Sequence, residues 1–409
     1  MTSHTPTRPP QGGRTTSASI TAAAATGPRR ATRRSGGLRP LAWAALLASG
    51  LAGSLHSPQA HAATRYWLFP CTGGDWPSIA CWSATFGGLP AFAAPTASDD
   101  AFLLAPGASS PQMVTLALPS RQPFLAQARD LKMYGNASFA AGLNMDSQTL
   151  SVRNLTVGAA SSSFLGQMNQ SGGATTVADT LRVSGGGYQM SGGLLNAQNL
   201  VLHSAGAAAT FTQTGGRLGA TTVSIGSDHN QAASFTQLAG RVDSANLNIG
   251  TGVLTSGALV SLSGAGSQWA NADLTVVGST GHGVLQLAGG AVASTGTAVL
   301  GVAPASTGRV TVQGAGSDWQ TTGLLTVGAA GSGLLQASTG GHIGAASIVL
   351  NGFVDGPDAG LAATVAGAGS TLTASESLLL GRTRGARLSV LDQAAVSSRF
   401  TVVGENTGL

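Results

Sequence analysis

The sequence predicts an all-β fold, a parallel β-helix in which short strands stack coil upon coil. Glycine pairs, or an Ala-Gly equivalent, begin at residues 172, 192, 215 and 239, and short apolar stretches recur with them. The composition, 43% hydrophobic and 9% charged, favours a packed core over disorder. The 60 glycines argue against a helical fold, because each costs about 1 kcal/mol relative to alanine inside a helix.

The repeat has a measurable period along the chain. The segment from Phe211 to Arg217 returns 24 residues later as Phe235 to Arg241. Further on the unit doubles, and Gly-Ala-Gly-Ser recurs at residues 264, 314 and 367. Trp269 and Trp319 follow the first two copies at the same offset, and Leu372 replaces them in the third. The predicted turn and core residues of this unit are Gly264, Gly266, Trp269, Gly314, Gly316, Trp319, Gly367 and Gly369.

Stacking explains why such a repeat folds. Asn, Asp and Gly tolerate the left-handed backbone angles of corners, and the apolar residues of each short strand point to one side. A single strand cannot bury that side, whereas coils stacked at about 4.8 Å bury a continuous column. We expect residues 131–409 to form about 12 such coils of roughly 20 to 25 residues. A non-helical β-solenoid or a sandwich array is the alternative arrangement.

The N-terminus resembles a secretory leader. Arginines at residues 29, 30, 33, 34 and 39 precede an apolar stretch from Leu41 to Leu55 that is short for a membrane span. Ala60-His61-Ala62 fits a signal-peptidase site, so we expect residues 1–62 to be removed between Ala62 and Ala63. An uncleaved anchor is the alternative. The leader holds seven of the 20 basic residues and no acidic one, which leaves 13 basic against 15 acidic residues and argues against nucleic-acid binding.

The segment 63–130 differs from the repeats and predicts an N-terminal cap. It contains both cysteines, Cys71 and Cys81, which we expect to form a disulfide because the chain is exported. It also concentrates tryptophans, at residues 67, 76 and 82. We expect these aromatic side chains to cover the first coil. Carbohydrate stacking on the tryptophans is the alternative.

The search for catalytic and metal-binding motifs is largely negative. The chain lacks a nucleotide P-loop, a G-x-S-x-G elbow and an H-E-x-x-H zinc motif, so we predict no cofactor, no metal and no catalytic residue. Histidines 203, 229, 282 and 342 are expected in coil turns, and arginines 382, 384 and 387 at a solvated coil edge. Asp99-Asp100 is the only adjacent acidic pair, and Asp228-His229 is the other candidate for acid–base chemistry.

Taken together, the residues resemble the passenger regions of autotransporter (type V secretion) proteins of Gram-negative bacteria. The resemblance rests on Trp67, Gly74-Asp75-Trp76, Cys81-Trp82, Pro90 and Asp99-Asp100, followed by repeats such as Val310 to Trp319 and Leu325 to Gly328. It implies a right-handed β-helix, export through the inner membrane, and a place at the cell surface, at the outer membrane or outside the cell.

The resemblance also implies a function, a structural stalk or adhesin without catalysis, with a host-cell, matrix or glycan ligand. A secreted β-helix enzyme that degrades polysaccharide, a lyase or glycosidase, is the alternative. Autotransporters carry a C-terminal translocator barrel, which is not in this sequence, so we expect the chain to be a truncated product. A complete, short secreted β-helix is the other interpretation.

Overall fold

A computed structural model describes residues 62–69, 71, 76–91, 93–116, 124–159, 164–204, 206–228, 232–252, 257–352, 360–382 and 384–404. The chain divides into two units, 1–57 and 58–409, and all described residues lie in the second. The expected leader therefore lies outside the described residues except for Ala62. In the described part, no helix has the length and apolar character needed to cross a membrane.

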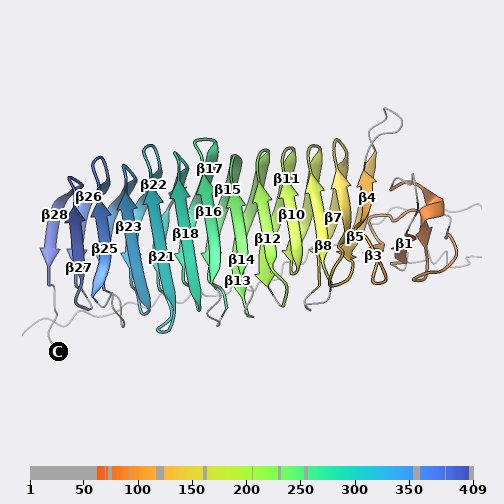
Figure 1. Cartoon of the computed structure of the whole chain (residues 1–409), viewed down its shortest axis with the longest axis horizontal. Coiled ribbons are helices and arrows are strands. Elements are labelled where there is room, and N and C mark those ends of the chain that lie inside the picture. Colours follow the sequence, from red (N-terminus) through yellow and green to blue (C-terminus); the bar gives the residue numbers. More distant parts are fainter. Residues whose placement is uncertain are drawn as a thin grey trace, which may run out of the picture. The chain divides into compact units, whose positions relative to one another are not determined.

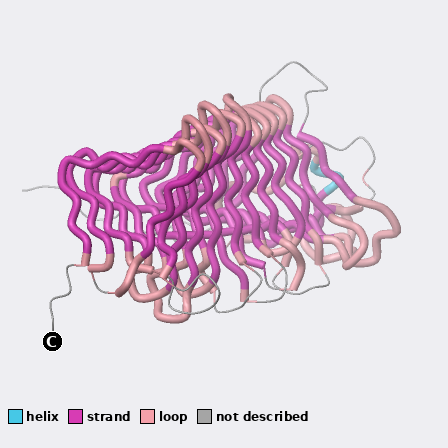
Figure 2. The backbone as a smooth tube through the Cα atoms, turned by 60° about the vertical axis from the view of Figure 1, so that its left-hand side comes forward, coloured by secondary structure: helices cyan, strands magenta, loops and turns pink. Residues whose placement is uncertain are grey.

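The second unit is a parallel β-solenoid of about 11 turns, which confirms the predicted fold class. Its strands lie side by side along one axis, from β1 (Thr64–Trp67) at one end to β28 (Ala395–Val403) at the other (Figure 1). A typical turn contributes one strand to each of two sheets, although one turn supplies two shorter strands to the larger sheet. The loops gather along the edges (Figure 2).

Sheet A has 16 strands, and all neighbours in it are parallel except β1 and β2. Its strands are β1 (Thr64–Trp67), β2 (Trp82–Ser83), β3 (Asp100–Leu104), β5 (Leu125–Tyr134), β7 (Thr149–Val157), β9 (Ala174–Val183), β11 (Leu194–Ser204), β13 (Arg217–Ser227), β15 (Gly240–Ile249), β17 (Ser267–Val277), β19 (Val292–Thr295), β20 (Thr297–Leu300), β22 (Asp318–Val327), β24 (His342–Leu350), β26 (Thr371–Leu380) and β28 (Ala395–Val403).

Sheet B has 12 shorter strands, all parallel. They are β4 (Gln112–Leu116), β6 (Ala141–Met145), β8 (Gly166–Gln170), β10 (Gly186–Met190), β12 (Ala209–Gln213), β14 (Ala233–Gln237), β16 (Ala258–Ser263), β18 (His282–Ala288), β21 (Thr307–Gln313), β23 (Ser332–Ser338), β25 (Leu361–Ala366) and β27 (Arg387–Leu391). The described chain has one further element, the 3-10 helix η1 (Ile79–Cys81).

The core lies between the two sheets and consists of columns of side chains. Burial alternates along most strands, as in β12, where Ala209, Phe211 and Gln213 point inward. Phe211 pairs with Phe235 in the next coil, so the 24-residue repeat is the stacking register itself. The rings of Tyr188, Phe211, Phe235 and Trp269 follow one another at centroid distances of 4.8, 4.8 and 4.9 Å. A buried aromatic stack therefore crosses four coils.

Stacking begins nearer the N-terminus than the expected boundary at residue 130. That boundary falls inside β5, which pairs in parallel with β3 before it and β7 after it. β3 in turn pairs in parallel with β1 of the expected cap segment. The repeat pattern did not reveal these first turns, because their sequences differ from the later ones while their backbone pairing is the same.

Candidate functional site

The predicted Gly-Ala-Gly-Ser residues form the same turn in three coils, between a strand of sheet B and one of sheet A. The first glycine has φ of +88°, +88° and +89° at Gly264, Gly314 and Gly367, a conformation that favours glycine. The serine that ends each turn is fully buried, and its hydroxyl donates to the carbonyl four residues earlier, at 2.7, 2.7 and 2.8 Å. These residues therefore stabilise the turn, and the buried serine hydroxyl cannot contact a ligand.

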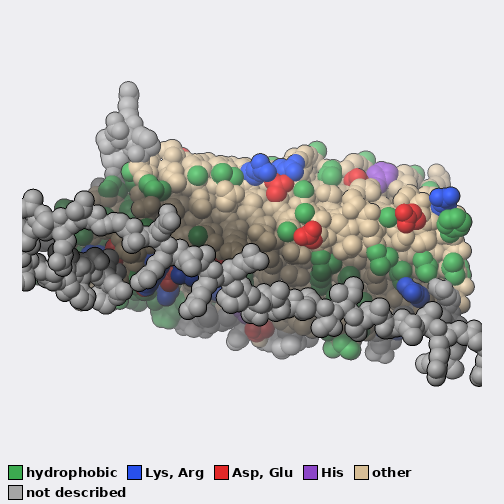
Figure 3. Space-filling view, turned by 180° about the vertical axis from the view of Figure 1, so that it is seen from behind, with side chains coloured by type: hydrophobic (Ala, Val, Ile, Leu, Met, Phe, Trp, Pro, Cys, Tyr) green, Lys and Arg blue, Asp and Glu red, His purple; other side chains and the backbone are tan. Residues whose placement is uncertain are grey.

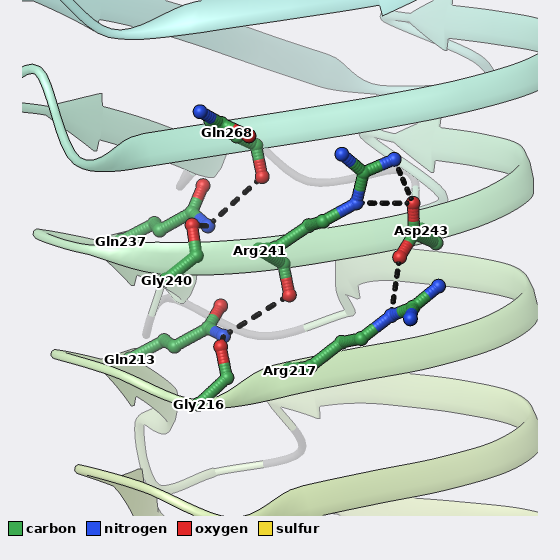
Figure 4. Close-up of polar contacts among 8 residues, drawn as sticks. All are labelled: Gln213, Gly216, Arg217, Gln237, Gly240, Arg241, Asp243 and Gln268. Carbon is green, nitrogen blue, oxygen red and sulfur yellow. Dashed lines mark hydrogen bonds and ion pairs between the residues drawn. The ribbon is translucent and has the colours of Figure 1, made fainter.

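In earlier coils, a buried glutamine stabilises the corresponding turn. This role was not predicted from the sequence. Gln213 Nε2 donates to the carbonyls of Gly216 and Arg241, at 3.2 and 3.3 Å. Gln237 Nε2 donates to those of Gly240 and Gln268, at 2.9 and 3.1 Å (Figure 4). Each amide thus satisfies carbonyls of its own turn and of the coil above it. The recurring Phe-Thr-Gln triplet was the available signal.

Trp269 and Trp319 occupy the same place two coils apart. Trp269 pairs with Ala293, and Ala293 pairs with Trp319. The column continues through Ile343 to Leu372, the residue that replaces tryptophan in the third repeat. Both tryptophans are buried, so they belong to the core and present no surface to a ligand.

Two arginines of adjacent coils share one carboxylate at the end of β13 and β15 nearest these turns. Arg217 Nε lies 2.8 Å from Asp243 Oδ2, and Arg241 Nη2 lies 2.7 Å from Oδ1 (Figure 4). The hydrogen bond from Arg241, with help from Arg217, lowers the pKa of Asp243 below its ordinary value. Both guanidinium groups are half exposed or more, so the cluster is a solvated ion-pair network on sheet A.

The acidic pair Asp99-Asp100 is structural. Asp99 is 6% exposed, and its carboxylate accepts from the backbone N–H of Ala63 at 2.9 Å and from Thr96 N–H and Oγ1 at 2.9 and 2.8 Å. Burial opposes ionisation, but the Thr96 and Ala63 hydrogen bonds outweigh it and lower the pKa of Asp99. Asp100 instead forms a bidentate pair with Arg129, at 2.9 and 2.6 Å. The two carboxylates have separate partners and do not form an acid–base pair.

The cap closes with the predicted disulfide between Cys71 and Cys81, which is confirmed. Trp67, Trp76 and Trp82 are 4%, 2% and 0% exposed, and the first two rings pack edge to face against Trp82. All three belong to the same buried cluster as Cys81. This burial argues against the alternative that the three tryptophans stack on carbohydrate, because almost none of their surface is exposed. Of the predicted cleavage residues, Ala62 is exposed and Ala63, which directly precedes β1, is half-buried.

Three of the histidines predicted in turns, at residues 203, 282 and 342, lie in strands instead. His203 is near the end of β11, and His282 and His342 begin β18 and β24. His203 Nε2 lies 3.0 Å from Asp228 Oδ2 on the next coil, so the structure gives Asp228 a partner other than its sequence neighbour. His229 lies outside the described residues. Across the described part of the chain, no three His, Cys, Asp or Glu side chains gather as a metal site would require.

Arg384 is a clamp across two coils, whereas the sequence predicted a solvated edge residue. Its Nη2 donates to the carbonyls of Gly328 and Gly331, both at 2.8 Å, and weaker contacts reach the two residues between them. The guanidinium thereby satisfies the turn after β22, more than fifty residues earlier in the chain. Sequence periodicity could not show this contact, because it occurs once.

The outer face of sheet B carries an unbroken column of uncharged polar side chains, one from each strand, which we call the polar ladder. Its members are aligned by the strand register: Thr115, Asn144, Asn169, Gln189, Thr212, Thr236, Ser261, Gln286, Thr311, Gln336, Thr364 and Ser389. All are at least partly accessible. Beside its first rungs lies a hollow of about 300 Å³ whose lining combines polar, acidic and apolar side chains. They are Asn144, Met145, Asp146, Asn169, Gln170, Ser171, Gln189, Met190, Ser191, Thr212 and Thr214.

Charge divides between the two sheets. The strands of sheet B contain two charged residues, Arg309 and Arg387, and no acidic one, whereas those of sheet A contain fifteen charged residues of both signs. Figure 3 shows a face of the rod with acidic and basic side chains scattered across it. The scarcity of charge on sheet B depends on how the coils stack, because residues close in sequence are divided between the two sheets.

Comparison with known proteins adds no relative: no family model, curated protein or solved structure matches this chain.

Proposed function

We propose that this chain is an exported β-solenoid, displayed on the surface of a Gram-negative bacterium or secreted, that acts as a stalk with adhesin-like contact faces and without catalysis. The observation that carries the proposal is the disulfide-closed cap at the start of about 11 stacked turns. Disulfides persist in oxidising compartments outside the cytosol, and a solenoid offers long faces to partners. The passenger of an autotransporter is one class of protein that combines these features.

The proposed contacts are with a host cell, matrix component or glycan, along the faces of the rod. Both sheets run the length of the solenoid and present side chains at a constant spacing of about 4.8 Å. The short turns are dominated by glycine, serine and alanine. Faces built by the strands therefore offer a larger and more regular surface than the loops.

The test is accessibility in the native bacterium. An epitope tag inserted after Gly107, an exposed loop position where an added Cβ meets no atom within 4 Å, reports location. We expect added protease to remove the tag from intact cells, or the tag to appear in the medium, while a periplasmic control protein stays protected. A tag reached only after lysis, with Cys71 and Cys81 open to alkylation without reduction, would contradict the proposal.

One observation favours a second candidate, a polysaccharide-degrading enzyme. His203 and Asp228 pair across adjacent coils, and a histidine–carboxylate pair can move a proton. A glycosidase of the usual kind needs two carboxyl groups about 5 to 9.5 Å apart, and this pair supplies one. Release of reducing ends from a polysaccharide panel, lost in both His203→Ala and Asp228→Ala, would establish the enzyme and displace the stalk.

A further inference from the structure

Asp99 is a buried carboxylate that neutral groups alone hold in place. Its side chain accepts three hydrogen bonds, and all three donors are uncharged groups of Ala63 and Thr96. None of the ion pairs in the described part of the chain includes Asp99. A buried charge normally has an opposite charge beside it, because burying it unpaired costs free energy. Asp99 is therefore an unusual choice for a purely structural acceptor.

One of the three donors has a special place in the sequence. Ala63 follows Ala62, and the bond between them is the predicted site of leader removal. The backbone nitrogen of Ala63 lies 2.9 Å from Asp99 Oδ1. Hydrolysis of that bond consumes one water molecule, leaves a carboxylate on Ala62 and turns this nitrogen into a primary amine, which is largely protonated at pH 7. The new cation forms on the atom that already contacts the buried carboxylate.

We propose that the bond between Ala62 and Ala63 is the processing site of this chain, and that Asp99 binds the α-ammonium group formed there. The inference rests on the proposed function, because it needs an exported chain whose leader is removed. It deepens that function by giving the buried carboxylate a role in maturation, since Asp99 acquires an opposite charge when the leader is cut off. The N-terminal cap is therefore more stable in the processed chain than in the precursor.

The contacts of Ala63 hold it beside Asp99 without help from the leader. Its carbonyl oxygen accepts from the backbone N–H of Asp100 at 2.9 Å. The next residue, Thr64, begins β1, which pairs in parallel with β3. The bond to be cut also lies where burial begins, because Ala62 is exposed and Ala63 is half-buried. Cleavage thus leaves the new amine in position.

Cleavage at a neighbouring bond would not place an amine at this position. A cut after Ala63 removes the donor altogether, and a cut before Ala62 leaves the charge on an exposed residue. Consecutive Cα atoms are about 3.8 Å apart, so a shift of one residue exceeds the length of a hydrogen bond. One bond therefore fits the carboxylate.

The other charged groups near Asp99 do not take the place of the α-ammonium. They are Arg65 on β1, Asp100 on β3, and Arg129 and Asp130 on β5. Asp100 and Arg129 bind each other through two hydrogen bonds, and Asp130 accepts from an asparagine of the next coil. Arg65 acts on Asp99 through space, without an ion pair. The α-ammonium differs from both arginines because it can donate directly to Oδ1.

The experiment measures the reactivity of the α-amine in the folded protein. In the full chain, residues 57–62 are replaced by the recognition sequence of a site-specific protease that leaves Ala63 as the first residue, and the purified protein is cut after folding. Lys132 is the single lysine of the sequence, so the processed chain has two amines and Lys132 is an internal reference. Acetic anhydride acylates unprotonated amines, and mass spectrometry of peptides gives the ratio of the two rates. Asp99→Asn removes the charge, and Asp100→Asn is the matched control.

We expect the α-amine at pH 8 to react, relative to Lys132, at least about tenfold more slowly in the wild-type chain than in Asp99→Asn, because the carboxylate stabilises the protonated amine. Asp100→Asn should keep the slow rate. Equal rates in the wild type and Asp99→Asn, or equal acceleration in the two variants, would overturn the inference.

The pH dependence of the wild-type rate separates ion pairing from simple burial, even if Asp99→Asn loosens the cap. Burial alone lowers the rate by the same factor at every pH, whereas an ion pair raises the pKa of the α-amine. An unpaired N-terminus has a pKa of about 7.7 to 8.0, and we expect a wild-type value about one unit higher. A wild-type α-amine that titrates as an unpaired one would overturn the inference.

The first residue of the protein recovered from the native bacterium separates this inference from the proposed function. Ala63 at the N-terminus of a surface-exposed or secreted chain supports both. A surface-exposed or secreted chain that begins at another residue overturns the inference and leaves the proposed function standing. A chain that stays inside the cell with its leader attached overturns both.

Discussion

Replacing the buried Asp99 with asparagine is expected to loosen the N-terminal cap far more than the same change at Asp100. The Asp99 carboxylate accepts three hydrogen bonds, one from Ala63 and two from Thr96. In asparagine, the remaining side-chain oxygen can still accept hydrogen bonds from Thr96 or from Ala63. The NH₂ group that replaces the other oxygen then faces an N–H donor, so no hydrogen bond forms there. Hydrogen bonds to a charged group contribute about 1.5 to 3 kcal/mol each, so the loss of at least one of them costs about 1.5 to 3 kcal/mol.

Hydrogen exchange of the segments around Ala63 and Thr96, followed by mass spectrometry, measures this change in the native state. Each 1.4 kcal/mol is a factor of ten, so exchange should accelerate by about tenfold to a little over a hundredfold in Asp99→Asn. The matched control is Asp100→Asn, which loses a pair with Arg129 that water already screens. Equal acceleration in the two variants would refute the reasoning.

The effect depends on pH with a defined sign. The pKa of Asp99 in the folded chain is lowered from its ordinary 3.8, so its stabilisation is complete above about pH 4 and is lost as the pH falls through the folded pKa. Wild-type cap protection should therefore decline below about pH 4 toward that of Asp99→Asn. A variant that keeps the full wild-type pH dependence would show that another group controls the cap.

Removal of the leader should increase the effect of Asp99→Asn on hydrogen exchange. In a chain cleaved between Ala62 and Ala63, the nitrogen now 2.9 Å from Asp99 Oδ1 becomes a charged α-ammonium. A buried ion pair then replaces a neutral donor, and removing one partner of such a pair costs more than removing a neutral hydrogen bond. Asp99→Asn should accelerate exchange more in the processed chain than in the unprocessed one. N-terminal acetylation of the processed chain should remove this additional acceleration of exchange. If the additional acceleration persists after acetylation, the charged α-ammonium is not its cause.

Three further changes test other contacts. Arg384→Ala should lower the free energy of unfolding in urea by about 1 to 3 kcal/mol, because carbonyls of residues 328–331 lose a charged donor. Arg384→Lys should recover only part of this loss. Full recovery would show that charge alone matters. Phe211→Ala should cost about 3 to 5 kcal/mol by the same measurement, since the ring is fully buried within the aromatic stack; a loss below about 1 kcal/mol would contradict that packing. Alkylation without reduction should add no mass at Cys71 or Cys81, and a two-thiol shift would disprove the disulfide.

The turn residues show how far local sequence carries the interpretation. The role of glycine at residues 314 and 367 can be predicted from the sequence, because these positions have a positive φ that few other residues adopt. The buried role of Gln213 and Gln237 was not readable, although the triplet repeats, because half of each amide's partners lie one coil away. Asp99 and Arg384 each contact a distant segment once in the chain, so the repeat pattern could not predict these contacts.

The sequence by itself determined the stacked β architecture, the 24-residue register that places Phe211 on Phe235, and the disulfide between Cys71 and Cys81. It could do so because in a solenoid the repeat length is also the distance between spatial neighbours, so local spacing encodes the stacking. Only the tertiary structure decided which sheet carries the charge, that the cap tryptophans are buried, and that twelve polar side chains align on sheet B. These depend on how corners and bulges turn each coil, and that geometry sets which side of the rod a residue faces.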